Sequence, residues 1–524
     1  MNFLKLFNTI KYLHYKQVYY RLFYLVRNRQ KKKIHKEPLV NELQPLQWKQ
    51  ALLFEDSFLG NNTFSFLNIT HRFEKKIDWN FVGHGKLWTY NLNYFDFLNQ
   101  ENIKSDKGLE LIWDYISKEN GLKDGLEPYP ISLRGINWIK FLSYNSISEK
   151  RIDQSLYNQY QSLMHNLEFH LLGNHLLENA YSLFFGAYYF RDDKIYHKAK
   201  AILKAELEEQ VLDDGAHFEL SPMYHQILLH RLLDCINLAQ SNTWKSDGTL
   251  VFLESKAIKM LSWLQAVTLS NGNIPMVNDS AFGIAPASNK IFNYAKDLGL
   301  TWKKGKLLDS GYRKFEKSNF EVFMDVGNVG PDYQPGHAHS DTFSFELYLD
   351  GKPIIVDTGT STYEKNELRQ RERETAAHNT VKVANKEQTE VWGGFRVAKR
   401  AKIITLEEAE NLLIGSHDGY GRIVHQRQFD FSGDSLVISD AINNSDVECE
   451  AFLHMHPKVG DIELVHNKVR LPGPAVEILF EGSGLTIKSV PCQIAMGFNK
   501  REASTKVSIG FKGSLTTTFR RIRA

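Results

Sequence analysis

The sequence predicts an α+β protein in which a helical (α/α) toroid or barrel precedes a large antiparallel β-sandwich. Between about residues 85 and 300, apolar residues recur at three- and four-residue intervals, as amphipathic helices joined into hairpins require. After about residue 310, short strand-like runs are separated by Asn, Asp and Gly turns. The chain has 524 residues, which is enough for two or three domains.

The N-terminal segment, residues 1–40, is basic, rich in tyrosine and compatible with helix. It lacks the unbroken apolar stretch and cleavage site of a secretory signal. We therefore expect the protein in the cytoplasm or at the periphery of the inner membrane, with a periplasmic location left open. Residues 1–33 could lie on an anionic membrane surface, or they could dock on the body of the protein with their charges solvated. The sequence favours docking.

Residues 41–310 are expected to form the helical domain and residues 311–524 the β-domain. The helical domain begins irregularly, with a short helix expected at 48–54. Further helices are predicted at 109–119, 138–147, 151–172, 178–190, 193–211, 223–241 and 250–270. Strands are predicted at 320–326, 342–349, 353–356, 380–383, 400–405, 412–416, 423–431, 435–441, 450–456, 476–481, 506–511 and 515–520.

Composition excludes several classes of function. A net charge of +3 is too small to indicate a nucleic-acid-binding protein. The three cysteines are far apart, which argues against a disulfide framework and against a cysteine zinc site. Aromatic residues make up 12% of the chain, and their rings suit either sugar binding or core packing. The oligomeric state is not indicated.

The most informative motif is GHAHSD at residues 336–341. His337 and His339 stand two residues apart, so on an extended segment they face the same side. His339, Asp357 and His378 could meet on adjacent strands as a divalent-metal site, which would leave His337 free for catalysis. A single histidine here would suggest an ordinary surface loop, but the cluster favours a functional site.

Two helix starts carry further candidates. Asn174 and His175 stand at one of them, where they could point into a cleft, although Asn174 could simply cap the helix. Ser221 and Pro222 mark the other and place Tyr224 in the first turn. The positive end of the helix dipole would favour deprotonation of Tyr224 there.

Other polar residues have weaker signals. Arg134 could pair with a carboxylate and Trp138 could stack on a sugar, but Arg134 could equally close a salt bridge between helices. Arg369, Arg371 and Arg373 form an alternating run that could bind an acidic chain at a cleft rim or could be solvated. The loop at residues 278–280 has no assigned role.

Together these residue types suit β-elimination from a uronic acid. The C5 proton becomes acidic only when the neighbouring carboxylate is neutralised. A tyrosine can remove that proton and can also protonate the leaving glycosidic oxygen. Hydrolysis would instead require two carboxylic acids, for which Glu178, Glu219 and Asp279 are available. A glycoside hydrolase and a non-catalytic glycan-binding or polysaccharide-assembly protein therefore stay open as alternatives.

Four motifs resemble the heparinase II/III family of polysaccharide lyases, which is related to some alginate lyases. They are NHLLEN at 174–179, SPMYH at 221–225, GHAHSD at 336–341 and AHNTV at 377–381. The resemblance covers residues 85 to about 400 and, more loosely, the rest of the β region. It implies an incomplete (α/α) toroid followed by an antiparallel β-sandwich, and an acidic polysaccharide such as a glycosaminoglycan as substrate.

The resemblance also implies residue roles. Tyr224 would be the catalytic base and acid, His337 an alternative base for one C5 epimer, and Tyr363 a further active-site tyrosine. The uronate carboxylate would be neutralised by Asn174 and His175. Substrate contacts are expected from Glu178, Arg134, Trp138 and Arg373. A structural zinc ion would be held by His339, Asp357 and His378. The basic N-terminal segment resembles that of family members found among surface-polysaccharide assembly proteins, which suggests the hypothesis that the protein edits the cell's own exopolysaccharide, with a degradative role left open.

Overall fold

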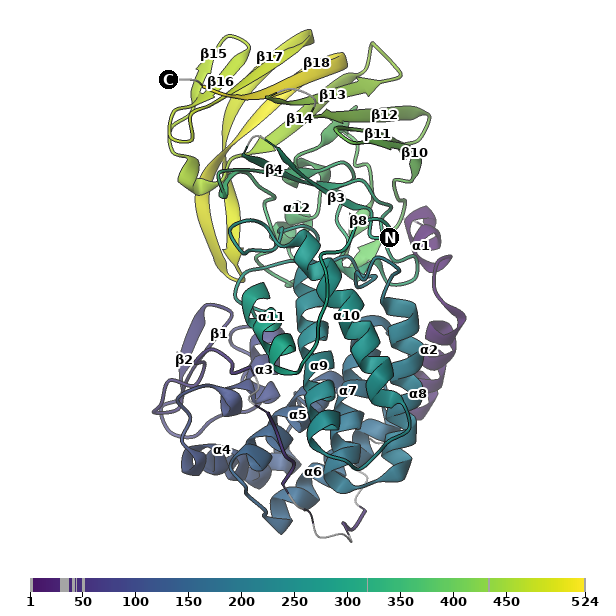
Figure 1. The fold of residues 1–524 in the computed structure, drawn as a ribbon, viewed down its shortest axis with the longest axis vertical. Coiled ribbons are helices and arrows are strands. Elements are labelled where there is room, and N and C mark those ends of the chain that lie inside the picture. Colours follow the sequence, from purple (N-terminus) through teal and green to yellow (C-terminus); the bar gives the residue numbers. More distant parts are fainter. Residues whose placement is uncertain are drawn as a thin grey trace.

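The computed structural model describes residues 3–28, 37–39, 43, 45–49, 52–317, 319–431 and 434–522. A body of helices lies beneath two stacked β-sheets (Figure 1). Within the described residues, no helix is long and apolar enough to cross a membrane. The lysines at 31–33, which belong to the expected membrane-facing segment, lie outside the described residues.

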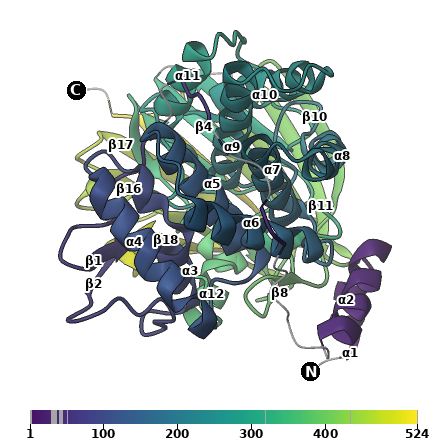
Figure 2. The same ribbon diagram turned by 90° about the horizontal axis from the view of Figure 1, so that it is seen from below.

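The helical body is built from helical hairpins that pack side by side. Figure 2 shows this body from below. Its helices are α3 (Lys86–Tyr94), α4 (Ser105–Lys118), α5 (Pro128–Tyr144), α6 (Lys150–His165), α7 (Gly173–Phe190), α8 (Asp193–Gln210), α9 (Pro222–Ser241), α10 (Thr249–Val267) and α11 (Ser288–Asp297). Apolar periodicity located most of them to within a few residues. Helix α5 begins ten residues earlier than predicted, with proline in its first turn, a position that suits proline.

The prediction of a helix at 48–54 is wrong. Residues 45–49 and 52–53 have no regular structure, and the segment lies against α9. The backbone N–H groups of Gln47 and Lys49 donate to the side chains of Asn242 and Asn237, at 3.0 and 3.1 Å. These bonds satisfy backbone donors without helix formation. A small hairpin, β1 (Thr63–Phe66) and β2 (Ile69–Arg72), follows.

The β-domain is an antiparallel sandwich, as predicted. The inner sheet is a meander of β3 (Tyr312–Lys317), β4 (Phe320–Asp325), β5 (Phe345–Leu349) and β6 (Lys352–Ile355). The outer sheet runs in the order β10 (Ile403–Ala409), β11 (Leu412–Tyr420), β12 (Ile423–Asp430), β13 (Leu436–Ile442), β18 (Lys500–Arg521), β17 (Val476–Gly497), β16 (Lys468–Leu471), β15 (Glu463–Val465). Strand β14 (Glu448–His454) joins β18 to β7 (Val381–Val383). Val322 and Leu347 of the inner sheet share one core with Phe429 and Ile478 of the outer sheet.

The long hairpin of β17 and β18 links the two halves of the molecule. It reaches down from the outer sheet beside the helices (Figure 1). At its tip, the carbonyl of Phe498 accepts a hydrogen bond from Asn68 at 2.9 Å. The Phe498 ring packs edge-on against Tyr363, with ring centroids 4.8 Å apart. The hairpin thus connects the sandwich to the helical core next to a predicted site residue.

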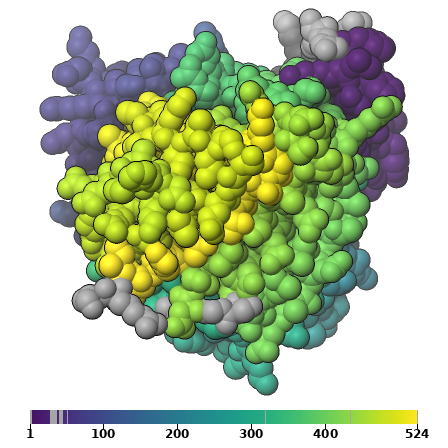
Figure 3. Space-filling view, turned by 90° about the horizontal axis from the view of Figure 1, so that it is seen from above, coloured from purple at the N-terminus to yellow at the C-terminus, as the bar shows by residue number. Residues whose placement is uncertain are grey.

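Helices α1 (Phe3–Ile10) and α2 (Tyr15–Asn28) dock on the flank of the body. They project at the edge of the molecule when it is seen from above (Figure 3). Gln17 is fully buried and donates to the carbonyl of Leu171 at 3.0 Å. In the structure, the described part of this segment is therefore docked on the body of the protein.

Candidate active site

A cavity of about 960 Å³ lies between the helical body and the sandwich. Asn174, His175, Tyr224, His337 and Tyr363 all line it. These are the five residues predicted to be catalytic, and they come from the starts of α7 and α9, from the short 3-10 turn Pro335–His337 and from the loop after β6. The fold therefore brings residues up to 189 positions apart in the sequence into one site.

Ser221 fixes the start of α9. Its hydroxyl accepts from the backbone N–H of Tyr224 at 3.3 Å and donates to the carbonyl of Asp279 at 2.9 Å. As a result, Tyr224 stands in the first helical turn, as the Ser-Pro pair predicts. The same serine ties this turn to the loop that carries Asp279.

Tyr224 lies against two other candidates. Its hydroxyl is 3.2 Å from that of Tyr363, and its ring centroid is 4.0 Å from that of His337. Burial raises the pKa of Tyr224 far above its ordinary value, and the charges of Asp279 and Glu219 raise it further, while the hydrogen bond with Tyr363 lowers it. The expected lowering of this pKa by the helix dipole is therefore outweighed, and Tyr224 holds its proton at rest.

His337 lies between two carboxylates. Its Nδ1 is 2.9 Å from Asp279 Oδ2, and its Nε2 is 3.2 Å from Glu219 Oε2. Both contacts are buried, so the ring orientation is fixed before any ligand arrives. A positioned imidazole beside a tyrosine hydroxyl is an arrangement suited to proton transfer.

Glu219 also positions Asn174. The backbone N–H of Asn174 donates to Glu219 Oε1 at 2.8 Å, and the Asn174 amide donates to Oε2 at 2.9 Å. Gly173, which precedes Asn174, has a φ of +58°, and an added Cβ would lie 2.5 Å from Glu219 Oε1. Only glycine fits there without displacing the carboxylate.

His175 lines the cavity and contacts a carboxylate. Its Nδ1 is 3.1 Å from Glu168 Oε1, and its ring lies beside Tyr129. Burial lowers its pKa, but the charge and hydrogen bond of Glu168 outweigh that effect and raise the pKa above its ordinary value. A protonated histidine at the cavity wall is well suited to bind a carboxylate.

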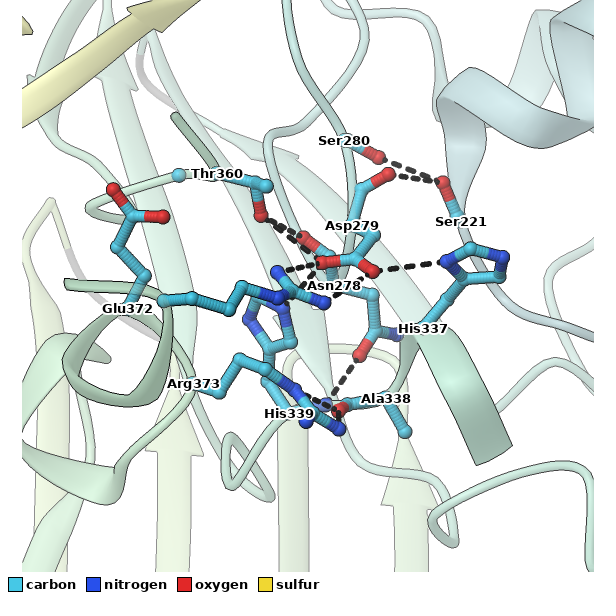
Figure 4. A network of polar contacts seen from close by, with 12 residues as sticks. Ser221, Asn278, Asp279, Ser280, His337, Ala338, His339, Thr360, Glu372 and Arg373 are labelled. Atoms are coloured by element: carbon cyan, nitrogen blue, oxygen red, sulfur yellow. Dashed lines mark hydrogen bonds and ion pairs between the residues drawn. The ribbon is translucent and has the colours of Figure 1, made fainter. Parts of the chain in front are cut away.

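Asp279 is the central acceptor behind the cavity (Figure 4). Besides His337 it binds His339 Nε2 at 2.9 Å, Thr360 Oγ1 at 3.2 Å and both terminal nitrogens of Arg369. Burial opposes its ionisation, but the Arg369 guanidinium and the two histidines hold the pKa of Asp279 well below its usual range. It is therefore a permanent anion that orients the catalytic-site histidines.

Sequence reasoning did not identify the positioning roles of Glu219, Asp279 and Arg369. The first two were considered only as hydrolytic acids, and Arg369 only as a member of an arginine run that could bind an acidic chain at a cleft rim or could be solvated. A usable signal was the polar triplet 278–280 inside an otherwise apolar stretch. Because both carboxylates are buried and bound to N–H groups of the site, they act as positioning residues here.

Arg134 and Trp138 do not contact the cavity, so their predicted substrate contacts are wrong. Both lie inside α5 and are fully buried. Arg134 donates to the backbone carbonyls of Asn93 and Gly125, both at 3.0 Å. Trp138 packs edge-on against Phe95 in the core. Both side chains stabilise the toroid instead of binding a ligand.

Arg373 and Glu178 are also buried away from the cavity lining, and the predicted contacts are wrong for them too. Arg373 donates to the carbonyls of Ala338 and Gly394, both at 2.8 Å, and so holds the GHAHSD loop. Glu178 lies 3.8 Å from Arg231 Nε, and burial raises its pKa to about 7. Arg231, rather than Glu178, reaches the cavity.

The predicted metal residues lie together behind His337. His378 Nδ1 is 2.7 Å from Asp357 Oδ2, and the rings of His339 and His378 are 5.3 Å apart. Over the part of the chain that the structure describes, no three His, Cys, Asp or Glu side chains are arranged as a metal site. Even so, His339 Nδ1, His378 Nε2 and Asp341 Oδ2 are buried without hydrogen-bond partners.

Sequence comparison finds two profiles of one family in this chain. The profile described as Heparinase II/III N-terminus matches residues 131–298, and the one described as Heparinase II/III-like, C-terminal matches residues 300–521. A heparin-sulfate lyase of Bacteroides stercoris is 24% identical over 481 residues, covering 83% of this chain and 68% of that protein. A heparin-sulfate lyase of Pedobacter heparinus is 26% identical over 307 residues, covering 52% of this chain and 45% of that protein.

Solved structures share the fold. The crystal structure of a heparinase III superposes with a TM-score of 0.67 at 17% identity, covering 86% of this chain and 80% of that one. A heparan sulfate lyase from Pedobacter heparinus superposes with a TM-score of 0.59 at 17% identity, covering 88% and 82%. The predicted order of a helical toroid followed by a β-sandwich is thereby confirmed.

Proposed function

The chain belongs to the heparinase II/III family of polysaccharide lyases, and from this premise we propose that it cleaves a uronic-acid-containing polysaccharide by β-elimination around Tyr224. One observation carries the proposal. The Tyr224–Tyr363 hydroxyl pair, the His337 ring and the polar groups of Asn174 and His175 face a single cavity. This set can neutralise a carboxylate and move protons beside it.

The proposed reaction begins with the uronate carboxylate against His175 and Asn174. Their charge and hydrogen bonds stabilise the enolate-like intermediate that forms when C5 loses its proton. That proton passes to His337, or to Tyr224 once substrate binding has driven the phenol's own proton into solvent, depending on which face of the sugar ring carries it. The C4–O bond then breaks, Tyr224 protonates the leaving oxygen, and a C4–C5 double bond remains. No water is consumed.

The cavity wall supports an acidic substrate. Besides His175, its cationic side chains are Arg21, Lys86, Arg231, Lys365, Arg396 and Arg400. The curated relatives are heparin-sulfate lyases, which agrees with a glycosaminoglycan or a comparable exopolysaccharide as the polymer. Tyr90, Tyr94 and Tyr129 add aromatic faces on which sugar rings can pack.

The reaction type is tested by cleavage in water enriched in heavy oxygen. Elimination yields an unsaturated end that absorbs ultraviolet light and carries no heavy oxygen. Hydrolysis would place heavy oxygen at the new reducing end without the absorbance, and would favour the hydrolase alternative. Binding of acidic polymers without any cleavage would favour a glycan-binding or assembly role.

We further propose that a divalent metal ion, expected to be Zn²⁺, binds near the site. The unpartnered ring nitrogens of His339 and His378 fit it, because a histidine that binds metal commonly gives its other ring nitrogen to a carboxylate, as these do to Asp279 and Asp357. Asp341 or Asp357 would supply the oxygen ligand. Such an ion would contribute fixed positive charge and hold the GHAHSD loop.

Metal content by elemental analysis tests that proposal, with thermal melting before and after chelation as a second readout. The protein as purified is expected to contain one equivalent, and His378→Ala is expected to lose it. An unchanged metal content in His378→Ala would contradict the assignment.

We also propose that α1 and α2 contact an anionic membrane with their outer face. Phe3 and Val26 are 78% and 72% exposed, and Lys11 and Lys16 of the same segment are exposed as well. Exposed apolar groups next to lysines match the chemistry of an anionic lipid surface. Co-sedimentation with anionic vesicles, but not with neutral ones, is expected. Unchanged binding by a Leu22→Ser/Val26→Ser variant would count against it.

A further inference from the structure

We propose that the N-terminal helices build a second anion-binding subsite in the same cavity, in which Arg21 and Arg396 hold a carboxylate or sulfate of a sugar away from the scissile bond. This inference rests on the proposed acidic polysaccharide substrate. Residues 1–40 lie outside the ranges matched by the family profiles, 131–298 and 300–521, so the comparisons assign them no role.

Helix α2 is attached to the segment that leads into the catalytic helix α7. Gln17 donates to the carbonyl of Leu171, Arg21 Nε to that of His170 at 3.4 Å, and Arg27 to Asn166 Oδ1. That segment continues directly into Gly173, Asn174 and His175. The position of α2 relative to the catalytic centre is therefore set by side-chain bonds instead of by loose apolar contact.

The two N-terminal helices form part of the cavity wall. Leu6, Thr9, Ile10, Leu13 and Arg21 line the same cavity as Tyr224. The wall also contains Trp392 of β8 (Val391–Trp392) and Arg396 of β9 (Arg396–Val397). Trp392 Nε1 donates to Thr9 Oγ1 at 3.2 Å, which joins the helices to this hairpin. One end of the cavity is thus built from two segments far apart in the sequence.

Arg21 and Arg396 both line the cavity, and both side chains are exposed to solvent. Partial burial lowers the pKa of Arg21, and the positive charge of Arg396 lowers it further. Across the described part of the chain, neither arginine forms an ion pair with a carboxylate, whereas their neighbour Arg400 pairs with Asp332 at 3.1 Å. The Arg396 guanidinium lies 4.7 Å from the Trp392 ring centroid, which restricts its position.

This arrangement favours an anion as ligand. Two guanidinium groups on one cavity wall without carboxylate partners favour a carboxylate or sulfate as ligand, and their planar donors suit both anions. The catalytic centre already provides His175 and Asn174 for the reacting uronate. A polymer that carries an acidic group on a neighbouring sugar could then engage both places at once, which raises affinity without altering the chemical step.

Binding and cleavage of the chosen acidic polysaccharide by Arg21→Ala, Arg396→Ala and the double variant test the subsite. Each single variant is expected to raise Kd and KM about tenfold, with kcat within about twofold of the wild type. The number of counterions released on binding, measured from the salt dependence of Kd, should fall by about one for each arginine removed. Arg422→Ala on the sandwich does not line the cavity and serves as the matched control, which should behave as wild type.

Kd and KM of both single variants within about twofold of wild type, with unchanged melting temperatures, would overturn the subsite. Binding is measured separately from turnover, so the two proposals can fail independently. A wild-type protein that binds the polymer through Arg21 and Arg396 but does not cleave it would support the subsite and contradict the lyase proposal. No binding to any acidic polymer would overturn both.

Discussion

Arg369 and Asp279 form a buried ion pair directly behind the catalytic-site histidines, with Arg369 Nη2 2.6 Å from Asp279 Oδ2 and Nη1 bound to Oδ1. Neither side chain is exposed. The same carboxylate orients His337 and His339. The pair therefore determines where the His337 and His339 rings lie, although of these residues only His337 lines the cavity.

Replacing Arg369 with alanine should be strongly destabilising, because it leaves a buried carboxylate without its main counterion. The expected loss is about 3 kcal/mol of unfolding free energy, with a melting temperature several degrees lower. Arg371→Ala is the matched control, since Arg371 lies two residues away on α12 (Glu367–Glu372) with its side chain 74% exposed. Equal melting temperatures for the two variants would contradict the role given to this pair.

Acid should destabilise the protein through its buried neutral histidines. Burial lowers the pKa of His225 to about 3. Its Nε2 lies 3.0 Å from the carbonyl of Met260, and its Nδ1 accepts from the backbone N–H of His217, which only the neutral ring can do. The unfolded chain binds a proton below about pH 6.5, whereas the folded chain resists it until about pH 3.

The contribution of His225 to the free energy of unfolding is therefore complete above about pH 6.5. Below that pH it falls by roughly 1 kcal/mol per pH unit. Thermal melting between neutral pH and about pH 5 should show this decline. His225→Gln should reduce the slope, while the exposed His466, replaced in the same way, should leave it unchanged. Equal slopes for His225→Gln and wild type would contradict the account.

Gly173→Ala tests the packing of Glu219 against Asn174. The new methyl group would meet Glu219 Oε1 at 2.5 Å and displace a carboxylate that positions Asn174 and His337. Activity is expected to fall at least about tenfold, because small displacements of catalytic groups are costly. Gly272→Ala is the control, with a φ of +85° and no atom within 4 Å. It should incur the same backbone strain, of about 1 kcal/mol, and keep full activity.

Tyr363→Phe should lower kcat about tenfold with little change in melting temperature. The variant loses the hydroxyl 3.2 Å from Tyr224 but keeps the ring that packs on Phe498. Since that hydrogen bond lowers the pKa of Tyr224, its loss should shift any tyrosine-dependent limb of the pH–rate profile upward. Tyr144→Phe, at a residue 79% exposed, should change nothing. An unshifted limb with unchanged kcat would place Tyr363 outside the reaction.

The sequence predicted the fold well because both periodicities are strong. Helices α8 and α9 begin within one residue of their predicted starts. Errors arose where tertiary contacts replace local pattern, as at 48–54, where α9 side chains bind an extended segment. The two predicted strands at 506–511 and 515–520 are parts of the single β18, because pairing with β17 continues past the turn-like Gly513.

The site was predictable only where its chemistry lies within short motifs. Tyr224, His337 and Asn174 each stand in such a motif, and the fold brings them together. Arg134 was misjudged because α5 is buried on almost every side, so that backbone carbonyls, and not a ligand, satisfy its charge. The partnership of Asp279 with Arg369 spans 90 residues and depends on tertiary structure alone.

The central claim is tested most directly by the ultraviolet absorbance of unsaturated uronate during incubation with acidic polysaccharides, comparing wild type with Tyr224→Phe. The phenylalanine keeps the ring contact with His337, 4.0 Å between centroids, and removes only the hydroxyl. The account predicts a steady rise with the wild-type protein and a loss of at least about a thousandfold in the variant, with substrate still bound. An equal rise in both proteins would contradict the assignment of Tyr224 as the proton-transferring group.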